Sequence, residues 1–499
     1  MTSGQIAGSR ITLAGRYTIE RELGTGGMGT VFQAFDAERC ERVALKTLRR
    51  SDAASIYRFK REFHSLADVS HGNLVQLYEL VAERDLWFFT MELIVGRDFV
   101  RHVRPGFERV FPSSGTTGGE SSQGGPSGAL ERQPGAAASI GNLDPVRLRD
   151  ALRQLIDGVE ALHAAAIVHC DLKPANVLVT DEGRVVILDF GVAAEIARSP
   201  ALQTIEDGLL GTIDYMSPEQ CAGELATPAS DWYSVGALLY EALTGRRPFT
   251  GSGIRVLLRK LDRDPPPPTA LAPGLPPDLV AVCRQLMARS PRDRPGDEEL
   301  RGHLRSSGSA AIVDQRGRQP EGMPLVGRTA HLGQLADALA EAERNRPVSV
   351  CVVGPSGIGK TTLVRHFTDD LAARRRAVVL SGRCFVRETV PYKALDGVID
   401  MLSRLLRAMP GHAVDPVLPR DVSALAHVFP VLRRVVAIER LASVAPQIPD
   451  PRELRRRAFA ALSEMLRTLG KQRPVVVHID DLQWADRDSA DVLNDLLQV

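Results

Sequence analysis

The stretch HCDLKPAN at residues 169–176, followed by ILDFG at residues 187–191, decides the fold of the first half of the chain. Four side chains in these two stretches can carry chemistry: Asp171, Lys173, Asn176 and Asp189. Carboxylate and amide oxygens are the ligands that Mg²⁺ prefers, and an ammonium group beside them neutralises phosphate charge. We therefore expect Asp171 to orient an acceptor hydroxyl and take up its proton, while Asn176 and Asp189 hold Mg²⁺.

A glycine-rich turn, a lysine and a glutamate come earlier in the chain. GTGGMGTV at residues 24–31 lies between two strand-like runs, and its missing side chains let backbone amides approach phosphates closely. Lys46 falls on the next strand-like run, and Glu62 falls on the helical stretch after it, where its carboxylate can fix the ammonium on phosphates. Each pattern alone also fits a tight hairpin or an exposed surface residue. Four motifs in this order are very hard to produce by chance, so we expect Lys46 and Lys173 to neutralise charge on a transferring phosphoryl group.

The scarcity of lysine supports this interpretation. Only seven of the 62 basic residues are lysines, so arginine is the default cation of the chain. Lysine carries a compact ammonium on a flexible stem, and the planar fork of arginine replaces it poorly where a single cation must enter a phosphate pocket. Three of the seven, Lys46, Lys173 and Lys360, stand in motif positions that require such an ammonium.

Composition and charge exclude several classes of protein. The hydrophobic share of 44% and the charged share of 25% are those of folded globular domains. The formal net charge of +1 gives no signature of a nucleic-acid or membrane-surface binder. The six cysteines are scattered without a C-x-x-C pair, which fits a reducing compartment. Because no run approaches the roughly 18 apolar residues of a spanning helix and residues 1–15 lack a signal peptide, we expect a cytoplasmic chain with no membrane partner.

Hydrophobic patterns predict the elements of the first half. Strand-like runs occupy residues 17–22, 30–36, 42–48, 74–80 and 86–93. A helical stretch over residues 56–68 interrupts them, and helical periodicity resumes at residues 145–166 and dominates up to residue 304. We therefore expect a small sheet with one helix, followed by a mainly helical region.

Composition also predicts where domains begin and end. Residues 105–142 and 305–323 are poor in apolar side chains, so they offer too little burial to offset the entropy of ordering. The division that we expect is a tail at 1–16, a domain at 17–304 with a disordered insertion at 105–142, a linker at 305–323, and a second domain at 324–499. In that second domain, apolar runs at 349–353, 377–380 and 475–479 alternate with helical segments, which predicts a parallel α/β sheet.

The motifs of the first half resemble those of the protein-kinase family, and the resemblance covers nearly all of residues 17–304. It implies an α+β bilobal kinase fold, with a small β-rich lobe and a large helical lobe, and transfer of the γ-phosphoryl group of Mg·ATP to a protein hydroxyl. Further matches are Ser217-Pro218-Glu219, Asp231 in the following helix, and Arg294, which in the family pairs with the residue that Glu219 matches. The D-L-K-P-x-N loop and the Gly211-Thr212 pair resemble the Ser/Thr branch.

The same resemblance implies an ATP site. Its residues would be Leu23, Gly24, Thr25, Gly26, Gly27, Met28, Gly29, Val31, Ala44, Lys46, Met91, Glu92 and Ile94. Met91 would be the gatekeeper, and Glu92 and Ile94 would lie at the adenine-binding hinge. One departure concerns Cys170, which stands where most members of the family have an arginine that grips an activation-loop phosphate. We therefore predict that activity does not strictly depend on phosphorylation of that loop.

A second phosphate-binding pattern lies in the C-terminal part. GPSGIGKT at residues 354–361 follows the apolar run 349–353 and opens a helical stretch, the setting in which G-x-x-x-x-G-K-[ST] cradles phosphates on backbone amides. The glycines of the pattern are Gly354, Gly357 and Gly359. We expect Lys360 to contact the β- and γ-phosphate oxygens and Thr361 to contact Mg²⁺.

An apolar run ends in two carboxylates further along the chain. Asp480 would hold Mg²⁺ through water and Asp481 would polarise an attacking water, although a buried strand capped by solvated acids is the competing interpretation. Together with PLVGR at residues 324–328, the segment 324–499 resembles the ATPase module of AAA/STAND signalling proteins. This family normally continues with a sensor strand and a helical lid, so we expect the module to be incomplete at its C-terminus.

Two functions of different classes follow. The leading interpretation is a protein serine/threonine kinase in intracellular signalling that uses ATP and Mg²⁺, acts on protein substrates with Ser/Thr acceptors, and is coupled to an ATP-binding STAND-like regulatory module. The alternative is an ATP-gated STAND-type signalling or transcription switch, with the kinase domain as an accessory or a scaffold. Self-association through the module is a possible consequence of either. Intact Lys46, Asp171 and Asp189 argue against a non-catalytic scaffold.

Overall fold

The computed structural model describes most of the chain in two compact units. The described residues are 11–26, 29–48, 52–67, 69–83, 86–107, 141–189, 213–251, 253–296, 299–300, 327–344, 346–355, 357–446 and 448–498. Unit 1 consists of Met1–Ala67, Leu77–Glu92 and Gln315–Val499, and unit 2 consists of Asp68–Gln76 and Leu93–Asp314. Residues 1–10, most of the expected insertion at 105–142 and the expected linker at 305–323 lie outside the described residues.

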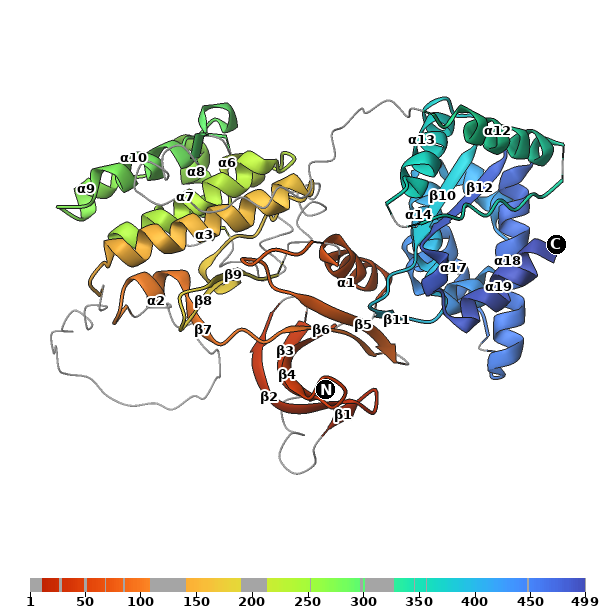
Figure 1. Ribbon diagram of the computed structural model, residues 1–499, viewed down its shortest axis with the longest axis horizontal. Coiled ribbons are helices and arrows are strands. Elements are labelled where there is room, and N and C mark those ends of the chain that lie inside the picture. Colours follow the sequence, from red (N-terminus) through yellow and green to blue (C-terminus); the bar gives the residue numbers. More distant parts are fainter. Residues whose placement is uncertain are drawn as a thin grey trace, which may run out of the picture. The chain divides into compact units, whose positions relative to one another are not determined.

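The N-terminal sheet of unit 1 follows the strand-like runs of the sequence (Figure 1). Its elements are β1 (Thr12–Leu13), β2 (Tyr17–Thr25), β3 (Gly29–Asp36), β4 (Glu41–Leu48), α1 (Ala53–Leu66), β5 (Leu77–Glu83) and β6 (Leu86–Glu92). The strand order is β1-β2-β3-β4-β6-β5-β11, and the first six strands pair antiparallel. Alternate apolar residues of these strands pack into one core, which includes Tyr17, Val43, Leu45, Val81 and Phe88.

An N-cap determines where the helix α1 begins, and its apolar face determines how it packs on the sheet. Asp52 is the N-cap, and its carboxylate accepts hydrogen bonds from the backbone amides of Ala54 and Ser55. Phe59 and Phe63, one turn apart, both pack against the ring of Phe89 on β6, with ring centroids 4.9 and 5.9 Å apart. The helix expected from residue 56 is therefore present, and it covers one face of the sheet.

The C-terminal module of unit 1 (residues 327–498) is an α/β structure. Its elements are α12 (Thr329–Glu343), α13 (Lys360–Ala373), β10 (Val378–Arg383), β11 (Glu388–Thr389), α14 (Lys393–Ala408), α15 (Gly411–Val414), η3 (Asp415–Val417), α16 (Val422–Val428), η4 (Pro430–Arg434), α17 (Val436–Val444), α18 (Pro451–Gly470), β12 (Val475–Asp480), η5 (Leu482–Trp484) and α19 (Arg487–Gln498). Strands β10 and β12 pair in parallel, as the apolar runs at 377–380 and 475–479 predicted.

The strand expected over residues 349–353 is wrong. These residues form no strand, and within the described part of the module the parallel sheet consists of β10 and β12. Strands in a parallel sheet are normally covered on both faces. Val350 and Val353 are instead 51% and 84% exposed, so the apolar run is not held in a sheet here.

Unit 2 is mainly helical and holds a small sheet (Figure 1). Its elements are β7 (Gly96–Asp98), α2 (Phe99–Val103), α3 (Pro145–Ala164), η1 (Pro174–Asn176), β8 (Val177–Thr180), β9 (Val185–Ile187), α6 (Pro218–Cys221), α7 (Pro228–Thr244), α8 (Gly253–Asp262), α9 (Pro268–Leu271), α10 (Pro277–Leu286) and η2 (Pro291–Asp293). Residues from Ser230 to Thr244 of α7 are all buried, so this helix is the central one of the unit.

One boundary of the sequence prediction shifts for a physical reason. The run expected as a strand from residue 74 is divided: β5 begins at Leu77, while Leu74 bridges Ile187 of β9 in unit 2. The backbone amide of Val75 donates to Ile187 O, and the side chain of Asn73 donates to Val185 O at 2.9 Å. These hydrogen bonds hold the first part of the run on the small sheet. Throughout the described part of the chain, no helix combines the length and apolar character needed to cross a membrane.

Candidate active site

In unit 1, β4 and α1 bring Lys46 and Glu62 together. Nζ of Lys46 donates to Oε1 of Glu62 at 2.7 Å, and both side chains are buried. Lys46 lies on the strand face that α1 covers, and its ammonium lies 5.8 Å from the centroid of the Phe89 ring. A buried cation with a charged partner and an aromatic neighbour has a fixed position. The structure therefore places a single ammonium at a defined point beside the glycine-rich turn.

The glycine-rich turn connects β2 to β3. The amide of Gly26 donates to Gly29 O at 2.8 Å, and Val31 lies opposite Lys46 in the pairing of β3 with β4. A Cβ at Gly29 would lie 1.8 Å from Thr47 O, so a larger residue would push β3 away from β4. Glycine is thus required there for a close approach of two backbones, in addition to any role toward phosphate.

The other residues expected around ATP spread over several elements. Ala44 on β4 pairs with Met91 on β6, and both side chains are buried. Glu92 ends β6, and Ile94 belongs to unit 2. The exposed end of β2 is formed by Leu23, Gly24 and Thr25. Gly27 and Met28 lie outside the described residues.

In unit 2, the catalytic-loop residues of the sequence motif form one cluster. Nζ of Lys173 donates to Oδ2 of Asp171 at 2.7 Å, and Nδ2 of Asn176 donates to the same oxygen at 3.1 Å and to Asp171 O at 2.9 Å. Within the described residues, Oδ1 of Asp171 accepts no hydrogen bond. The carboxylate is therefore oriented through one oxygen, while the other keeps its capacity to accept a proton.

The loop itself is held by Asp231 of α7, which the sequence pattern matched but did not place in the site. Its carboxylate, fully buried, accepts the backbone amides of His169 and Cys170 at 2.8 Å each, and Nε2 of His163 lies 2.9 Å from it. Cys170 has φ +64°, a left-handed conformation that costs a non-glycine residue about 1–2 kcal/mol. Asp231 stabilises this bend, which directs Asp171 out of the core.

Cys170 does not act as a surface group in this loop. Its side chain is 3% exposed, and burial raises the pKa of the thiol, with smaller contributions from Asp231 and Asp171. Nε2 of Gln220 on α6 donates to Cys170 O at 3.0 Å, a contact that sequence reasoning missed. The position for which the family resemblance implies an arginine is thus a buried neutral residue here. The prediction about activation-loop phosphorylation concerns residues 190–212, which lie outside the described residues.

Asn176 and Asp189 lie on adjoining segments. The amide of Leu188 donates to Asn176 O at 2.8 Å, so the residue before Asp189 is anchored to Asn176. Asp189 has φ +45°, a left-handed conformation that turns the chain at this point. Because the Nδ2 group of Asn176 is occupied by Asp171, its amide oxygen is the atom that remains for a cation. One amide oxygen and one carboxylate fit the oxygen ligands that Mg²⁺ prefers.

A buried ion pair in unit 2 joins Arg294, which follows η2, to Glu219 on α6. Arg294 donates to both carboxylate oxygens of Glu219, at 2.7 and 2.8 Å, as the family resemblance implied. Burial tends to raise the pKa of Glu219, but the hydrogen bonds from Arg294 and its charge outweigh burial, so the pKa is lowered. Glu219 also accepts the hydroxyl of Ser230 on α7. The pair therefore ties α6 to α7 beneath the catalytic loop.

The second phosphate pattern opens α13 in unit 1. Gly357 and Gly359 have φ of +79° and +90°, conformations that L residues rarely adopt. Nζ of Lys360 donates to Gly354 O and Pro355 O, both at 2.9 Å, and the turn is exposed. The lysine side chain thus folds back over its own loop.

The two acidic residues after the apolar run differ in their partners. The hydroxyl of Thr361 donates to the carboxylate of Asp480 at 3.0 Å, which brings together residues 119 positions apart. Asp481 has φ +54°, and its carboxylate accepts Nε of Arg383 at 2.9 Å. Sequence reasoning missed Arg383, because nothing in the local sequence marks it as a partner of Asp481.

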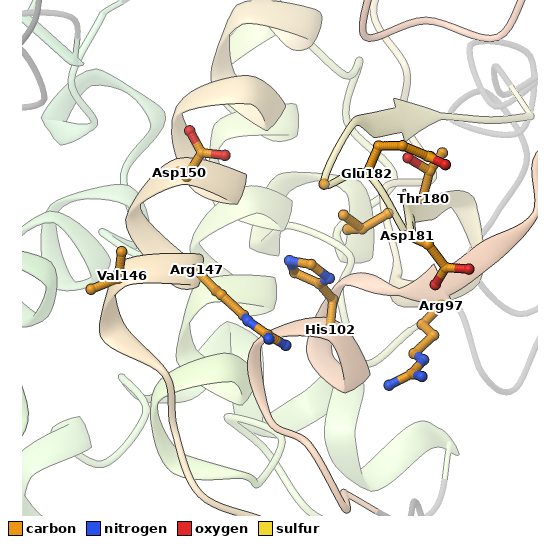
Figure 2. A pocket seen from close by; sticks show the side chains of 10 residues that line it. Arg97, His102, Val146, Arg147, Asp150, Thr180, Asp181 and Glu182 are labelled. Carbon is orange, nitrogen blue, oxygen red and sulfur yellow. The ribbon is translucent and has the colours of Figure 1, made fainter.

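A cavity of about 570 Å³ lies in unit 2 (Figure 2). It is lined by Arg97 of β7, His102 of α2, Arg147 and Asp150 of α3, and the turn between β8 and β9. Burial lowers the pKa of His102, and the charges of Arg147 and Arg97 add to this effect. None of the catalytic-loop residues lines the cavity, so it is separate from the site above.

Comparison with known proteins agrees with this geometry. Residues 17–304 match the protein kinase domain, and residues 324–499 match the AAA ATPase domain. Serine/threonine-protein kinase PknA of Mycobacterium tuberculosis is 32% identical over 330 residues, which cover 64% of this chain and 67% of PknA. Serine/threonine-protein kinase PrkC of Bacillus subtilis is 31% identical over 293 residues, which cover 58% of this chain and 39% of PrkC.

A solved structure also matches. The kinase domain of Mycobacterium tuberculosis PknI shares 23% identity with a TM-score of 0.41, and the match covers 60% of this chain and 98% of that domain. The kinase-domain match alone covers more than half of the 499 residues. The chain therefore belongs to the protein kinase family, and an AAA ATPase domain follows its kinase domain.

Proposed function

We propose that this chain transfers the γ-phosphoryl group of Mg·ATP to serine and threonine hydroxyls of proteins in intracellular signalling, with Asp171 receiving the hydroxyl proton. Membership of the family makes the chain a protein serine/threonine kinase that uses ATP. The roles of single residues are our assignment. The observation that supports them best is the cluster around Asp171, in which one carboxylate oxygen is held by Lys173 and Asn176 and the other accepts no hydrogen bond within the described residues.

Charged groups in each of the two units support phosphoryl transfer. Lys173, on the same loop, would neutralise charge on the phosphoryl group, and the Lys46–Glu62 pair would hold a second ammonium for the α- and β-phosphates. Asn176 and Asp189 would hold Mg²⁺, which neutralises phosphate charge when bound. The protein accelerates phosphoryl transfer mainly by positioning the reactants and by stabilising negative charge, and cations and oxygen ligands of this kind do both.

The test is transfer of labelled γ-phosphate from Mg·ATP to a generic Ser/Thr protein substrate. Asp171→Asn keeps the size of the side chain and removes its basicity, so kcat should fall by about 10²–10⁴-fold. Asp181→Asn, at an exposed aspartate of the same unit, is the matched control and should transfer at the wild-type rate. Transfer by Asp171→Asn at the wild-type rate would overturn the assigned role.

A second candidate function rests on the C-terminal module. The contact of Thr361 with Asp480 and the position of Lys360 support an ATP-binding site, and a switch that is gated by this site remains the alternative, with the kinase as accessory or scaffold. Binding of a fluorescent ATP analogue to Asp171→Asn, with and without Lys360→Ala, would test the second site while kinase turnover is blocked. Transfer by the wild-type chain to a protein substrate would count against the scaffold.

Several expectations stay predictions. They are the domain boundaries at 17–304 and 324–499, the cytoplasmic location, self-association through the module and hydrolysis of ATP at the second site. We propose the domain boundaries because the two domain matches have these extents, and we propose the cytoplasmic location because both domains use ATP. Size-exclusion chromatography with light scattering, at several protein concentrations, would test self-association.

A further inference from the structure

The helix α1 has a second face that the catalytic interpretation does not use. Tyr57, Lys60 and His64 recur along it at helical spacing, and all three contact side chains of the C-terminal module in unit 1. Successive residues of a helix turn by about 100°. Lys60 therefore points to nearly the opposite side of α1 from Glu62, which faces Lys46. The same helix carries a catalytic contact on one side and a module contact on the other.

Lys60 is the centre of this contact. Its ammonium donates to both carboxylate oxygens of Asp396 at 2.6 Å and to Asp400 at 3.2 Å, and its side chain is only 2% exposed. Asp396 and Asp400 are one turn apart on α14, so their carboxylates lie on the same face. Removal of one partner from a buried ion pair leaves an uncompensated charge, which makes such a contact specific for its partner.

Apolar packing surrounds the ion pair. Tyr57 is buried in the hydrophobic core of the module, together with side chains of α14, η4 and α16. The guanidinium of Arg434 lies 3.7 Å from the centroid of the Tyr57 ring, a close cation–π contact. Two turns further along α1, the ring of His64 stacks on Phe385 with centroids 4.4 Å apart. A side chain of the kinase domain thus completes the core of the ATPase module.

A backbone contact joins the module to the N-terminal sheet. The short strand β11 pairs in parallel with β5, which makes it the seventh strand of that sheet (Figure 1). The amide of Leu80 donates to Arg387 O at 3.0 Å, and the guanidinium of Arg387 donates to Leu77 O at 3.0 Å. Addition of a strand to a sheet edge uses main-chain hydrogen bonds for affinity and neighbouring side chains for specificity.

Two elements of the module that contact α1, β11 and α14, are joined to residues of the second nucleotide site by a short stretch of chain or by hydrogen bonds. Arg383, the partner of Asp481, ends β10, and β11 begins five residues later at Glu388. Asp486, just after the acidic pair, accepts the backbone amides of Tyr392 and Lys393 at the start of α14. Both elements that hold α1 are therefore anchored to residues that flank the Thr361–Asp480 contact.

We propose that the ATPase module is a built-in activator of the kinase: it docks on the outer face of α1 and the edge of β5, holds Glu62 against Lys46, and docks more tightly when its own site holds nucleotide. This inference rests on the proposed kinase function. In the docked arrangement the Lys46–Glu62 pair is formed at 2.7 Å, so docking favours the arrangement that fixes the ammonium on phosphates. Lys60 acts as a positioning residue, because its ammonium is engaged by Asp396 and Asp400 of the module and would act on the kinase through α1.

Docking can be measured by hydrogen exchange in the full-length chain. The amide of Leu80 is protected by Arg387 of the module, whereas the next amide, that of Val81 opposite Phe88, faces β6 and serves as the internal control, because successive amides of a strand point to opposite neighbours. Lys60→Met should raise exchange at Leu80 and reduce phosphoryl transfer by about tenfold. Lys471→Met, at an exposed lysine of the module, is the matched control and should change neither quantity.

Coupling between the sites is read from a double-mutant cycle. Lys360→Ala should lower kinase activity in the wild-type background and have no further effect in the Lys60→Met background, a result that a purely structural role of Lys60 would not produce. The triple variant Lys60→Met, Asp396→Asn, Asp400→Asn removes the three charges of this ion pair and leaves Glu388, the buried partner of His64, in place. It should regain most of the protection of Leu80 and most of the activity, which separates a lost ion pair from a misfolded helix.

The outcomes separate the inference from the proposed function. If exchange at Leu80 is unchanged in Lys60→Met, the docking surface is wrong. If exchange rises while activity and its response to Lys360→Ala stay unchanged, the surface does not control the kinase, and the inference is overturned. If the wild-type chain transfers no phosphate, the proposed function fails, whereas exchange at Leu80 still reports whether the module docks.

Discussion

Replacement of Arg294 by alanine should lower the free energy of unfolding of unit 2 by about 3–5 kcal/mol, the range for loss of one partner from a buried ion pair. The side chains of Arg294 and Glu219 are 0% and 5% exposed. The substitution removes two charge-assisted hydrogen bonds to Glu219 and those to the carbonyls of Ala288 and Ala229. Within the described residues, Glu219 then keeps the hydroxyl of Ser230 as its side-chain partner, so its charge would be buried with little compensation.

The chain contains a matched control. Arg149 and Asp278 form a similar two-pronged pair, with Arg149 nitrogens 2.9–3.1 Å from the carboxylate, but their side chains are 37% and 50% exposed. Exposed pairs contribute at most about 1 kcal/mol, because water screens the charges and the side chains lose entropy. Arg149→Ala should therefore cost less than about 1 kcal/mol. The difference between the two variants isolates the effect of burial from that of geometry.

The pH dependence gives a second check on the buried pair. Since Arg294 keeps the pKa of Glu219 below its ordinary value, the pair stabilises the fold above that ordinary value and loses its effect as the pH falls through the lowered one. Without Arg294, burial dominates and raises the pKa of Glu219. The deficit of Arg294→Ala should therefore shrink as the pH falls from about 7 to about 5, because Glu219 then takes up a proton.

Native-state hydrogen exchange is a suitable assay, since peptides from the buried helix α7 report on unit 2 within the full-length chain. Exchange would be followed over a range of guanidinium concentrations for the wild type and both arginine variants. Equal losses of stability for Arg294→Ala and Arg149→Ala would refute the reasoning. So would a deficit of Arg294→Ala that grows as the pH is lowered.

Four further predictions follow from the structure. Asp231→Asn should reduce kcat by about tenfold or more, because it removes an acceptor from the amides of His169 and Cys170; steady-state kinetics with a thermal melt would separate activity from stability. Gly29→Ala should lower stability by about 1–3 kcal/mol through its clash with Thr47 O, whereas Gly72→Ala meets no atom within 4 Å and is the control in the same melts. Treatment with a phosphatase should leave at least half of the kinase activity, since Cys170 offers no cation to an activation-loop phosphate; complete loss would contradict this. Burial raises the pKa of Asp400 to about 6, a rise that Lys60 opposes and Asp396 increases, so protonation of Asp400 favours the buried contact. The protection of the Leu80 amide should therefore increase as the pH falls from about 7 to about 5, and Asp400→Asn should remove most of that change. His64 and Glu388 are the other titratable groups at this contact.

The sequence alone was sufficient for the fold class and for the residues of the kinase motifs. The glycine-rich turn, Lys46, the loop from His169 to Asn176 and Asp189 each sit in a short local pattern, and their order along the chain identifies the family. Strands β2, β3, β4 and β6 follow from their content of β-branched and aromatic residues, and the helix α1 follows from apolar residues at helical spacing. Motifs and elements of this kind can be predicted because neighbouring residues in the sequence determine them.

Other features depended on distant parts of the chain. The run at 349–353 has the composition of a strand, yet it forms none, because a strand exists only where a partner supplies hydrogen bonds. The run from residue 74 is divided for the same reason, since Leu74 and Val75 contact Ile187 of β9, whereas β5 begins at Leu77. Composition reports what a segment prefers, and tertiary contacts decide which preference is met.

The contacts of Lys60 show this limit most clearly. The chain has seven lysines, and Lys60 lies in a stretch that the sequence predicts as an amphipathic helix. From the sequence alone, it has the appearance of a solvated surface residue. In the structure it is buried against Asp396, which lies 336 positions further along the chain. No local period encodes a partner at that distance, and only packing of the module on α1 makes the burial of a cation favourable. The sequence by itself therefore determined which chemistry the chain carries, whereas the tertiary structure decided which of its surfaces are joined.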